Sequence, residues 1–263
     1  MSTSLEKAPV PIIVPRPTND IVVRQFRPED AEQIHTMLVE GLVYGHDSPC
    51  NTARQRYLFR PVSYAAYTAI ALGALLFAHT LPAVPNATLK AVGALLALSG
   101  AALILYIRSS ATAGFLAFCA TARATDMADI NASYGVPRLG EPPETQGPAG
   151  FWVAAIGTEV VGYLGLDYTA SPDPASGELR RMIVSTRHRR RGIGTLLIAA
   201  AVAHARTHSP PLRELDLETT EFQPGAQTLY AGMGWARIGE RWIIMGKVVR
   251  VRVFRYRRRV DVE

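Results

Sequence analysis

The sequence predicts an α/β fold that is interrupted by a membrane-spanning helical hairpin. Three observations support this prediction. Residues 61–107 contain two long uncharged stretches, and the segments on both sides alternate between helical periodicity and short runs typical of β-strands. The stretch "RHRRRGIGTLL", residues 187–197, is a basic loop with two glycines that leads into an apolar helix. At 263 residues the chain has room for one domain with an inserted module.

The composition leaves several ligand classes open. A net charge of +6 and a pI of about 9.5 suit an anionic ligand, nucleic acid or an anionic membrane surface. The two cysteines, Cys50 and Cys119, provide neither a disulfide framework nor a metal cluster, so no metal is expected. Residues 1–20 are Pro-rich and lack a long apolar core, so we expect a disordered tail rather than a secretory signal. Residues 21–263 are expected to form one domain.

The hydropathy pattern places a hairpin at about residues 61–107. The first run, "PVSYAAYTAIALGALLFAHTL", is long enough to span a bilayer, and the second, "AVGALLALSGAALILYI", is at the short end of the range. Pro82 and Pro85 break the chain between them. The alternative is a buried hairpin within a soluble domain, which so long an uncharged stretch disfavours. Small residues recur at helical spacing on both runs and favour close helix packing: Ala65, Ala69, Gly73, Gly93, Ala97 and Ala101.

The charges that flank the two runs predict their orientation in a membrane. Arg54, Arg56 and Arg60 precede the first run, Arg108 follows the second, and only Lys90 lies in the connection. Because cytosolic flanks are enriched in Lys and Arg, both ends of the hairpin are predicted to be cytosolic.

The remaining segments read as strands and helices in a defined order. Residues 21–26 have the composition of a strand, and residues 27–42 begin with a proline and two acidic residues, which suit a helix N-terminus. A helix is predicted over 111–134, after the hairpin. The periodicity then changes, and the expected elements are strands at 151–156, 160–168 and 177–185, a helix at 192–208, a strand at 212–218, a helix at 224–233 and a strand pair at 234–253 that turns at Gly239 and Glu240.

The basic loop and the helix that follows it predict an anion site. The N-terminus of a helix presents unpaired N–H groups and the positive end of its dipole. Gly192 and Gly194 have no side chains, so a phosphate can approach the backbone, and Arg189 and Arg191 add positive charge. A pyrophosphate is the expected ligand. A Rossmann dinucleotide site is disfavoured, because a third glycine and the required strand order are missing.

The spacing Arg189-x-x-Gly192-x-Gly194 resembles the acetyl-CoA motif of the GNAT-family N-acetyltransferases, and "TLYAGMGW" (228–235) resembles the family's second signature. The element order also matches that fold, which implies a mixed, mainly antiparallel sheet flanked by helices. Together with the hairpin, the segments "TDMADI", "FWVA" and "ELRRMIV" are similar to the membrane-bound, camello-like branch, which contains N-acetylaspartate synthetase and the cysteine-S-conjugate N-acetyltransferases. The resemblance implies acetyl-CoA as co-substrate and a small amine as acceptor.

The resemblance also assigns the residues that contact acetyl-CoA. Backbone N–H groups of one strand would hold the pantetheine arm, and the basic loop with the helix start would bind the pyrophosphate. These expected contacts are Met182, Ile183, Val184, Arg189, Arg190, Arg191, Gly192, Ile193, Gly194 and Thr195. Two positions depart from the family pattern, because Gln223 stands where Asn is common and Arg190 stands where glycine is common. Neither departure removes the anion site.

Acetyl transfer to an amine requires a base for the amine and an acid for the leaving thiolate. Tyr230 lies where the family places a general acid, and the alternative is a tyrosine that only packs its ring. Glu178 lies where some members keep a glutamate base, and the alternative is a surface or ion-paired residue. Glu218, Asp167 and a water chain are weaker candidates for the base.

A substrate contact is expected from one of two neighbouring arginines. Strand alternation would let only one of Arg180 and Arg181 face the cleft. The resemblance favours Arg181 as the partner of an acidic acceptor. The alternative for this arginine is a solvated position on the surface.

The end of the chain, residues 250–259, alternates arginine with apolar residues. This pattern is typical of an edge strand with one basic face, and that face is a candidate contact for anionic lipid. Nucleic-acid binding is disfavoured, because a membrane-tethered domain has little access to it and no reading motif is present.

These observations predict a membrane-anchored N-acetyltransferase that moves an acetyl group from acetyl-CoA to the amine of a small amino acid or amino-acid conjugate. A protein-lysine acetyltransferase and a catalytically silent acetyl-CoA-binding scaffold are the alternatives. The endoplasmic reticulum membrane, with the catalytic domain facing the cytosol, is implied by the resemblance.

Overall fold

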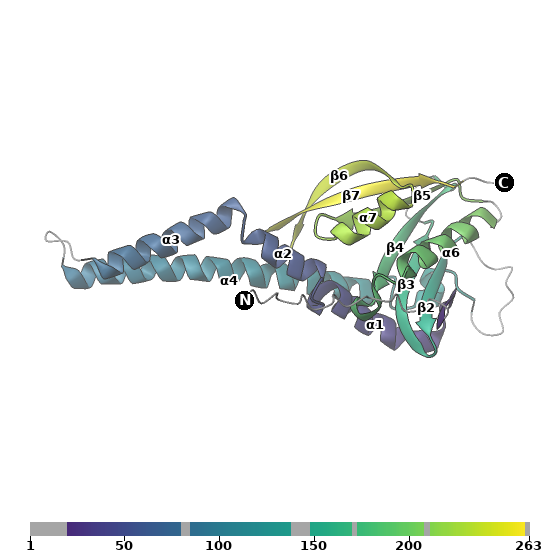
Figure 1. Cartoon of the computed structure of the whole chain (residues 1–263), viewed down its shortest axis with the longest axis horizontal. Helices are drawn as coiled ribbons and strands as arrows, with labels where there is room; N and C mark the ends of the chain where they lie inside the picture. The colour runs from purple at the N-terminus through teal and green to yellow at the C-terminus, as the bar shows by residue number, and fades with distance from the viewer. Residues whose placement is uncertain (1–19, 80–84, 138–147, 170–172, 208–210, 261–263) are drawn as a thin grey trace, which may run out of the picture.

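The computed structural model describes residues 20–79, 85–137, 148–169, 173–207 and 211–260. The expected N-terminal tail therefore falls almost entirely outside the described residues. The strands are β1 (Ile21–Gln25), β2 (Gly150–Ile156), β3 (Glu159–Asp167), β4 (Ser176–Val184), β5 (Glu214–Thr220), β6 (Ala236–Met245) and β7 (Val249–Arg259). They form one sheet in the order β1-β2-β3-β4-β5-β7-β6 (Figure 1). Only the β4–β5 pair is parallel within this sheet, so the predicted mixed, mainly antiparallel sheet is confirmed.

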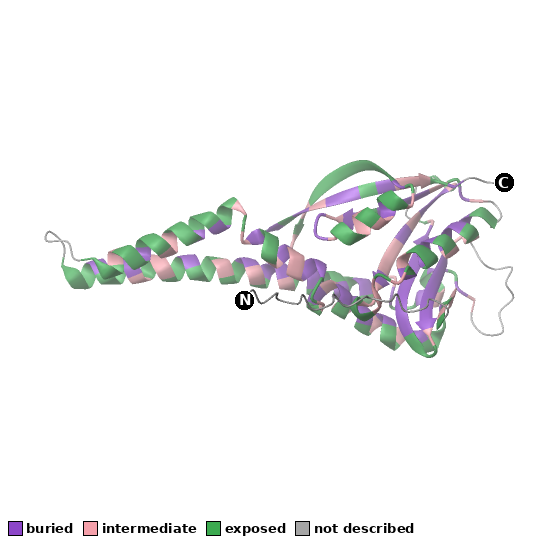
Figure 2. Cartoon of the chain, in the orientation of Figure 1, coloured by how far each residue is buried: buried purple, intermediate pink, exposed green. Residues whose placement is uncertain are grey.

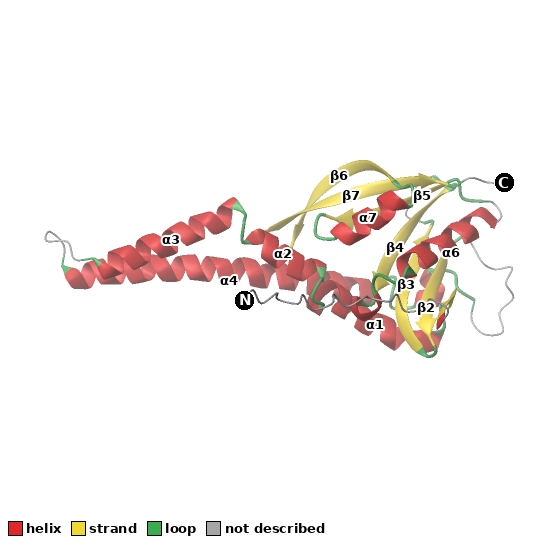
Figure 3. Cartoon of the chain, viewed as in Figure 1, coloured by secondary structure: helices red, strands yellow, loops and turns green. Residues whose placement is uncertain are grey.

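Helices cover both faces of the sheet. They are α1 (Ala31–Val39), α2 (Pro49–Tyr57), α3 (Pro61–Ala78), α4 (Asn86–Ala124), α5 (Ile130–Ser133), α6 (Ile193–Thr207) and α7 (Pro224–Gly232), with short helical turns η2 (Pro28–Asp30), η3 (Glu40–Tyr44) and η5 (Thr186–His188). Figure 2 shows β2 and β3 buried, and Figure 3 shows the helices on either side of the strands. Leu197 of α6 packs with Leu164 in one core, and Phe115 of α4 packs with Phe151 in the other.

The hairpin forms two long helices, but its second helix does not end where the sequence predicts. α4 is a single helix of 39 residues, about 58 Å long at 1.5 Å per residue. It joins the second apolar run to the helix predicted over 111–134, because no proline interrupts its hydrogen bonding. Ile107, where the sequence predicts the end of the hairpin, is instead the point at which α4 passes from the exposed stalk into the core. From Ile107 onward α4 enters the core, where Phe115 and Cys119 are buried.

α3 and residues 86–106 of α4 project from the domain as a stalk (Figure 1). Leu95, Leu98 and Leu105 on this stalk are 71%, 68% and 67% exposed. Both helices contain a stretch that is long and apolar enough to cross a membrane. These apolar side chains face outward, so the hairpin is not buried against the rest of the described chain, in contrast to the alternative of a buried hairpin.

Small residues hold the two stalk helices together, as the sequence predicts. A Cβ on Gly93 would lie 2.6 Å from the backbone oxygen of Gly73 and 2.7 Å from the backbone nitrogen of Phe77. A Cβ on Gly73 would lie 2.5 Å from the backbone nitrogen of Ala97. Since the obstructing atoms belong to the backbone, they cannot turn aside as a side chain would. The helices are therefore in direct backbone contact over these positions.

The last strand pair turns later than predicted. β6 continues through Gly239 and Glu240 with an irregularity in its register, and the turn falls at Gly246, where φ is +64°. The backbone N–H of Lys247 donates to Ser110 Oγ at 3.0 Å. A Cβ on Gly246 would collide with the backbone oxygen of Ser110. The position of this turn is therefore determined by contact with α4, which the local sequence does not reveal.

β7 lies between β5 and β6, so the predicted edge strand over residues 250–259 is wrong. Some of its basic side chains form ion pairs with acidic residues of β5. Arg255 Nη2 and Arg257 Nε lie 2.5 Å and 2.7 Å from carboxylate oxygens of Asp216. Arg257 Nη1 also lies 2.8 Å from an oxygen of Glu214. These arginines contribute to pairing within the sheet rather than to a free basic surface.

Replacing Gly93 with isoleucine is expected to destabilise the stalk, because the atoms nearest to the new Cβ are backbone atoms of α3. Overpacking of this kind costs about 1–3 kcal/mol. The thermal unfolding midpoint of the detergent-solubilised chain, followed by circular dichroism, should fall. The matched control is Ala91→Ile, at an exposed position of the same helix. Equal midpoints for the two variants would contradict the backbone contact.

Candidate active site

The candidate site begins where two neighbouring strands stop pairing. The parallel ladder joins Ser176–Leu179 of β4 to Glu214–Leu217 of β5, although β4 continues to Val184 and β5 to Thr220. Among the described residues, no strand pairs with the β5-facing edge of β4 beyond this point. Backbone N–H and C=O groups along an unpaired strand edge are available to a ligand. We refer to this part of β4 as the open edge.

The register of β4 distinguishes among the predicted backbone contacts. The backbone N–H of Ser185 donates to the carbonyl of Val161 at 2.9 Å. Because hydrogen-bonded pairs alternate along an antiparallel ladder, the N–H of Ile183 also points toward β3. The N–H of Val184 then points away from β3, toward the open edge. Val184 therefore has the orientation that a ligand along this edge requires, whereas the Ile183 N–H is used within the sheet.

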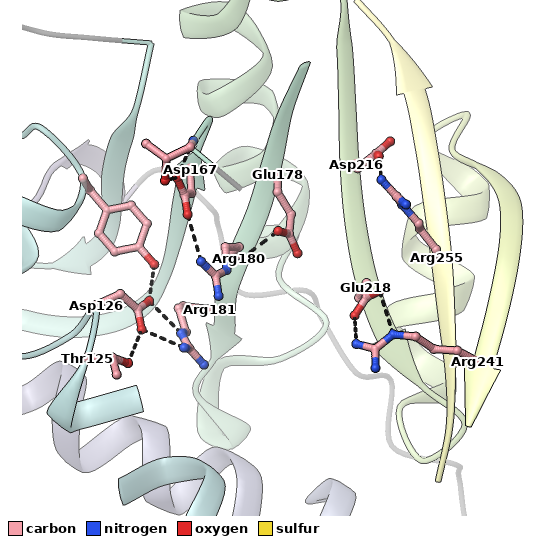
Figure 4. Close-up of polar contacts among 12 residues, drawn as sticks. Thr125, Asp126, Asp167, Glu178, Arg180, Arg181, Asp216, Glu218, Arg241 and Arg255 are labelled. Atoms are coloured by element: carbon pink, nitrogen blue, oxygen red, sulfur yellow. Dashed lines mark hydrogen bonds and ion pairs between the residues drawn. The ribbon is translucent and has the colours of Figure 1, made fainter. Parts of the chain in front are cut away.

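β4 contains a bulge at Arg181. Tyr163 pairs with Ile183 and Gly165 pairs with Arg180, so β4 accommodates one extra residue, and Arg181 has a φ of +57°. A side chain in this left-handed region costs about 1–2 kcal/mol. The bulge breaks the strand alternation, so the expectation that only one arginine faces the cleft side is wrong. Figure 4 shows both guanidinium groups on the same side of β4.

Asp126 holds Arg181 in place. Its carboxylate accepts hydrogen bonds from Arg181 Nε at 2.8 Å and Nη2 at 2.7 Å, and the Tyr134 hydroxyl donates at 2.5 Å. Burial alone would raise the pKa of Asp126, but the bonds from Arg181 and Tyr134 outweigh burial and lower the pKa to about 2. The guanidinium also lies 5.2 Å from the centre of the Phe118 ring. The Arg181 side chain is only 11% exposed, so a solvated position is wrong for it.

Tyr230 of α7 lies beside the open edge. Its hydroxyl is 3.7 Å from Sδ of Met182, and its ring packs against Trp235 and Tyr256. Burial raises the pKa of Tyr230 to about 12, so the phenol is protonated at neutral pH. A Cβ on Gly194 would lie 2.9 Å from Cε of Met182. The structure therefore brings together Tyr230, Met182 and Gly194, which come from three separate predicted elements.

The basic loop ends at the start of α6, as predicted. The backbone N–H of Leu196 donates to the carbonyl of Gly192 at 3.0 Å, and the N–H groups before it, in the first turn, have no intrahelical partner. Ile193 is buried, whereas the Thr195 side chain is exposed on this turn. Gly192 has a φ of +75° and Arg190 a φ of +63°. Arg190, which stands where the family commonly has glycine, therefore adopts a left-handed backbone conformation that glycine would adopt without strain.

Two of the predicted anion-binding arginines have carboxylate partners in this structure. Arg191 Nη2 lies 2.9 Å from an oxygen of Asp20, and Arg189 Nη1 lies 3.9 Å from an oxygen of Asp47. Both carboxylates are more than half exposed, so water screens these pairs. An anion at the start of α6 would compete with these carboxylates for the same guanidinium groups.

Glu178 is the least paired of the three candidate bases (Figure 4). Burial raises the pKa of Glu178, and this is opposed by Arg180, whose Nε is 4.0 Å away. Asp167 accepts a hydrogen bond from Arg180 Nη1 at 2.8 Å, and Glu218 accepts two from Arg241 at 2.7 Å and 3.2 Å. A paired carboxylate is a weaker proton acceptor. The geometry therefore favours Glu178 over the two alternatives.

The sequence interpretation assigned no role to Asp126, although this residue organises the bulge. Asp126 and Arg181 are 55 positions apart, and no spacing rule relates residues so distant in the chain. Asp126 does fall within "TDMADI", one of the segments that carries the family resemblance. This segment could have marked Asp126 as a candidate residue, but nothing in it indicates that Asp126 pairs with Arg181.

Part of the sequence matches the model of a known protein family. The sequence model of the acetyltransferase (GNAT) family matches residues 123–235. This segment runs from the end of α4 to the residue before β6, and it contains Asp126, the open edge, the start of α6 and Tyr230. The matched part of the chain is therefore similar to the GNAT family over somewhat less than half of the sequence.

The curated relatives narrow the class, and they confirm the resemblance to camello-like proteins. N-acetyltransferase 8F1 of Rattus norvegicus is 36% identical over 149 residues, which cover 54% of this chain and 60% of that protein. N-acetyltransferase 8 of Rattus norvegicus is 38% identical over 125 residues, which cover 45% of this chain and 50% of that protein. The chain thus spans about half the length of the curated relatives it matches. Among solved structures, an N-acetyltransferase from Staphylococcus aureus Mu50 aligns with a TM-score of 0.48 and 11% identity over 92% of this chain and 99% of that chain.

Replacing Asp126 with asparagine is expected to destabilise the domain by about 3–5 kcal/mol, because it leaves the Arg181 guanidinium buried without a counter-charge. The measurement is the unfolding free energy in detergent. Glu29→Gln is the matched control, since it breaks an exposed ion pair worth about 1 kcal/mol or less.

The same pair predicts an acid sensitivity. The lowered pKa of Asp126 means that its stabilising contribution is complete above its ordinary value of 3.8 and is lost as the pH falls toward about 2. Wild-type stability should therefore decline over that interval, and the decline should be shallower in Asp126→Asn. Parallel curves for the two proteins would contradict this assignment.

Proposed function

We propose that the chain is a membrane-anchored, acetyl-CoA-dependent N-acetyltransferase that acts on the amine of a small amino acid or amino-acid conjugate. The observation that carries the proposal is the convergence of Tyr230 and Gly194 on Met182 at the open edge of β4. A strand edge with free N–H groups, a helix start and a protonated phenol surround this one residue. Those are the groups that acetyl transfer from a thioester to an amine requires.

The chain's own groups fit acetyl-CoA along its length. The Val184 N–H lies on the open edge, where an extended pantetheine arm can add its amides as a strand would. The first turn of α6 offers unpaired N–H groups next to Gly192, and a pyrophosphate suits this positive end of the helix. Arg189 and Arg191 flank that turn and would exchange their exposed carboxylate partners for phosphate oxygens.

Tyr230 would protonate the departing CoA thiolate. A general acid must hold its proton until the transition state, and burial keeps the Tyr230 phenol protonated at neutral pH. Its hydroxyl points at the Met182 sulfur, a weak acceptor, so a thiolate can replace that contact without breaking a strong hydrogen bond.

Glu178 would accept a proton from the acceptor amine, directly or through water. Its carboxylate is partly buried, and its ion-pair partner among the described residues, Arg180, lies 4.0 Å away through Nε. Burial raises the pKa of Glu178 and outweighs the opposing effect of Arg180. Asp167 and Glu218 lie near it and serve instead to bind Arg180 and Arg241.

An acceptor with a carboxylate would find positive charge on the same side of β4. Arg181 uses Nε and Nη2 for Asp126, so Nη1 is the nitrogen through which it would contact the acceptor. Arg180 is the second guanidinium on this side and is 33% exposed. Together with Glu178, these arginines suit a molecule that carries both an amine and an acid group.

The stalk would cross the membrane, with the domain on the cytosolic side. The outward-facing leucines of the stalk and the length of its helices support this placement. Arg56, Arg60 and Arg108 lie at the base of the stalk and only Lys90 lies near its tip, which supports a cytosolic base. Residence in the endoplasmic reticulum is part of the proposal through the family resemblance.

The proposal is tested by release of free CoA from acetyl-CoA by the detergent-solubilised chain, with a panel of amines. The panel contains aspartate, other free amino acids, S-benzyl-cysteine and lysine peptides. Release with one class of free amino acid or conjugate is expected. Tyr230→Phe is expected to lower kcat by about 100-fold with an unchanged Kd for acetyl-CoA, because the hydroxyl donates only to a weak sulfur acceptor before the reaction.

Other outcomes separate the competing functions. Release with lysine peptides alone would favour a protein acetyltransferase. Binding of acetyl-CoA without release for any amine would favour the silent scaffold. An unchanged kcat in Tyr230→Phe would remove the acid role from Tyr230 while leaving the transferase assignment in place.

A pH profile tests the base. Glu178 must be deprotonated to accept a proton, so kcat/KM should fall as the pH drops toward its raised pKa. Glu178→Gln is expected to lower kcat by about 100-fold or more and to remove this acidic limb. Glu218→Gln is the matched control and should keep the limb, since Glu218 is bound to Arg241. An acidic limb that persists in Glu178→Gln would assign the base elsewhere.

A further inference from the structure

A pocket of about 470 Å³ lies at the base of the stalk, away from the candidate active site. Its walls come from three parts of the chain that meet there: the segment from the end of α2 to the start of α3, the middle of α4 and the β6–β7 hairpin. The hairpin wall is fixed, because the Lys247 N–H donates to Ser110 Oγ of α4 and the backbones approach closely at Gly246 and Gly114. The pocket is therefore part of the permanent contact between the sheet and the stalk.

One side of the pocket is basic. Arg60 and Arg250 both line it. Arg60 Nη2 lies 3.0 Å from a carboxylate oxygen of Glu221. Arg250 is exposed, its guanidinium lies 5.2 Å from the centre of the Trp242 ring, and no carboxylate of the described residues forms an ion pair with it. The pocket therefore carries one positive charge that the protein does not neutralise.

The other side of the pocket is apolar and faces outward. Val62, Leu103 and Tyr106 line it from the stalk, and Trp242 lines it from β6. Each of these side chains is at least one-third exposed. Tyrosine and tryptophan are the residues that concentrate where a bilayer's apolar interior meets its headgroups. A ligand that complements both sides has an anionic headgroup and a long apolar chain.

We propose that this pocket binds one anionic phospholipid of the surrounding bilayer. Its phosphate lies between Arg250 and Arg60, and one acyl chain follows Leu103 and Val62 along the stalk. The inference rests on the membrane insertion in the proposed function, because only then does the base of the stalk lie at headgroup level. The bound lipid would fasten the β6–β7 hairpin to the membrane surface.

The test places the full chain in lipid nanodiscs and measures quenching of tryptophan fluorescence by brominated lipids. The chain has three tryptophans. Trp152 and Trp235 are 6% and 4% exposed in the core, whereas Trp242 is 45% exposed and lines the pocket. Quenching by lipid therefore reports on Trp242. Brominated phosphatidylglycerol and brominated phosphatidylcholine are compared at the same minor fraction in phosphatidylcholine discs.

Brominated phosphatidylglycerol is expected to quench Trp242 more strongly than brominated phosphatidylcholine. Arg250→Gln should reduce this headgroup preference by about fivefold, the effect of losing one arginine near a lipid phosphate. Arg206→Gln, an exposed arginine of α6, is the matched control and should retain the preference. Both variants should release CoA at the wild-type rate in detergent, which shows that they are folded.

Equal quenching by the two brominated lipids in the wild type would overturn the inference while leaving membrane insertion intact. An equal loss in Arg206→Gln and Arg250→Gln would also overturn it, because the preference would then reflect net charge rather than this pocket. Failure of the chain to enter nanodiscs would reject membrane anchoring and the lipid site together. The CoA-release assay in detergent would still test the transferase activity by itself.

Discussion

The bidentate ion pair between Arg181 and Asp126 is the interaction on which the rest of the site depends. Arg181 sits in a backbone conformation that is unfavourable for any side chain, and Asp126 supplies the opposing charge that keeps it there. The bulge that results shifts the register of β4 just before Met182 and Val184. The same bulge brings two guanidinium groups to one side of the strand. A single contact between the end of α4 and the middle of β4 thereby sets both the ligand edge and the charge beside it.

The order of elements and the start of α6 could be predicted from the sequence, because they depend on local signals. Periodicity, glycine position and charge within a few residues are enough to define a strand, a helix start or an apolar hairpin. The same local signals predicted the wrong position for the turn near the C-terminus. Gly239 looked like the turn residue, but β6 absorbs it as an irregularity, and Gly246 turns the chain where Ser110 of α4 meets it.

The site was predicted in part for the same reason. Tyr230 and Gly194 each belong to a local motif, so the sequence could nominate both, and the fold brings both to Met182. The partners of the arginines could not be nominated, since Asp126 lies on a distant segment and a strand pattern assumes regular alternation. A bulge is the feature that this assumption excludes. The edge position predicted for residues 250–259 was wrong for a similar reason, because β6 pairs with β7 on its other side and Asp216 of β5 binds Arg255 and Arg257.

The continuity of α4 has a mechanical consequence. A helix of 39 residues without an interruption transmits rotation and tilt from one end to the other. One end of this rod belongs to the stalk, and the other ends just before Asp126. A domain joined through a flexible linker could swivel freely above a bilayer, whereas this one is mounted rigidly. For a stalk held in lipid, as we propose, the angle of α4 would therefore set the height and direction of the candidate site relative to the bilayer.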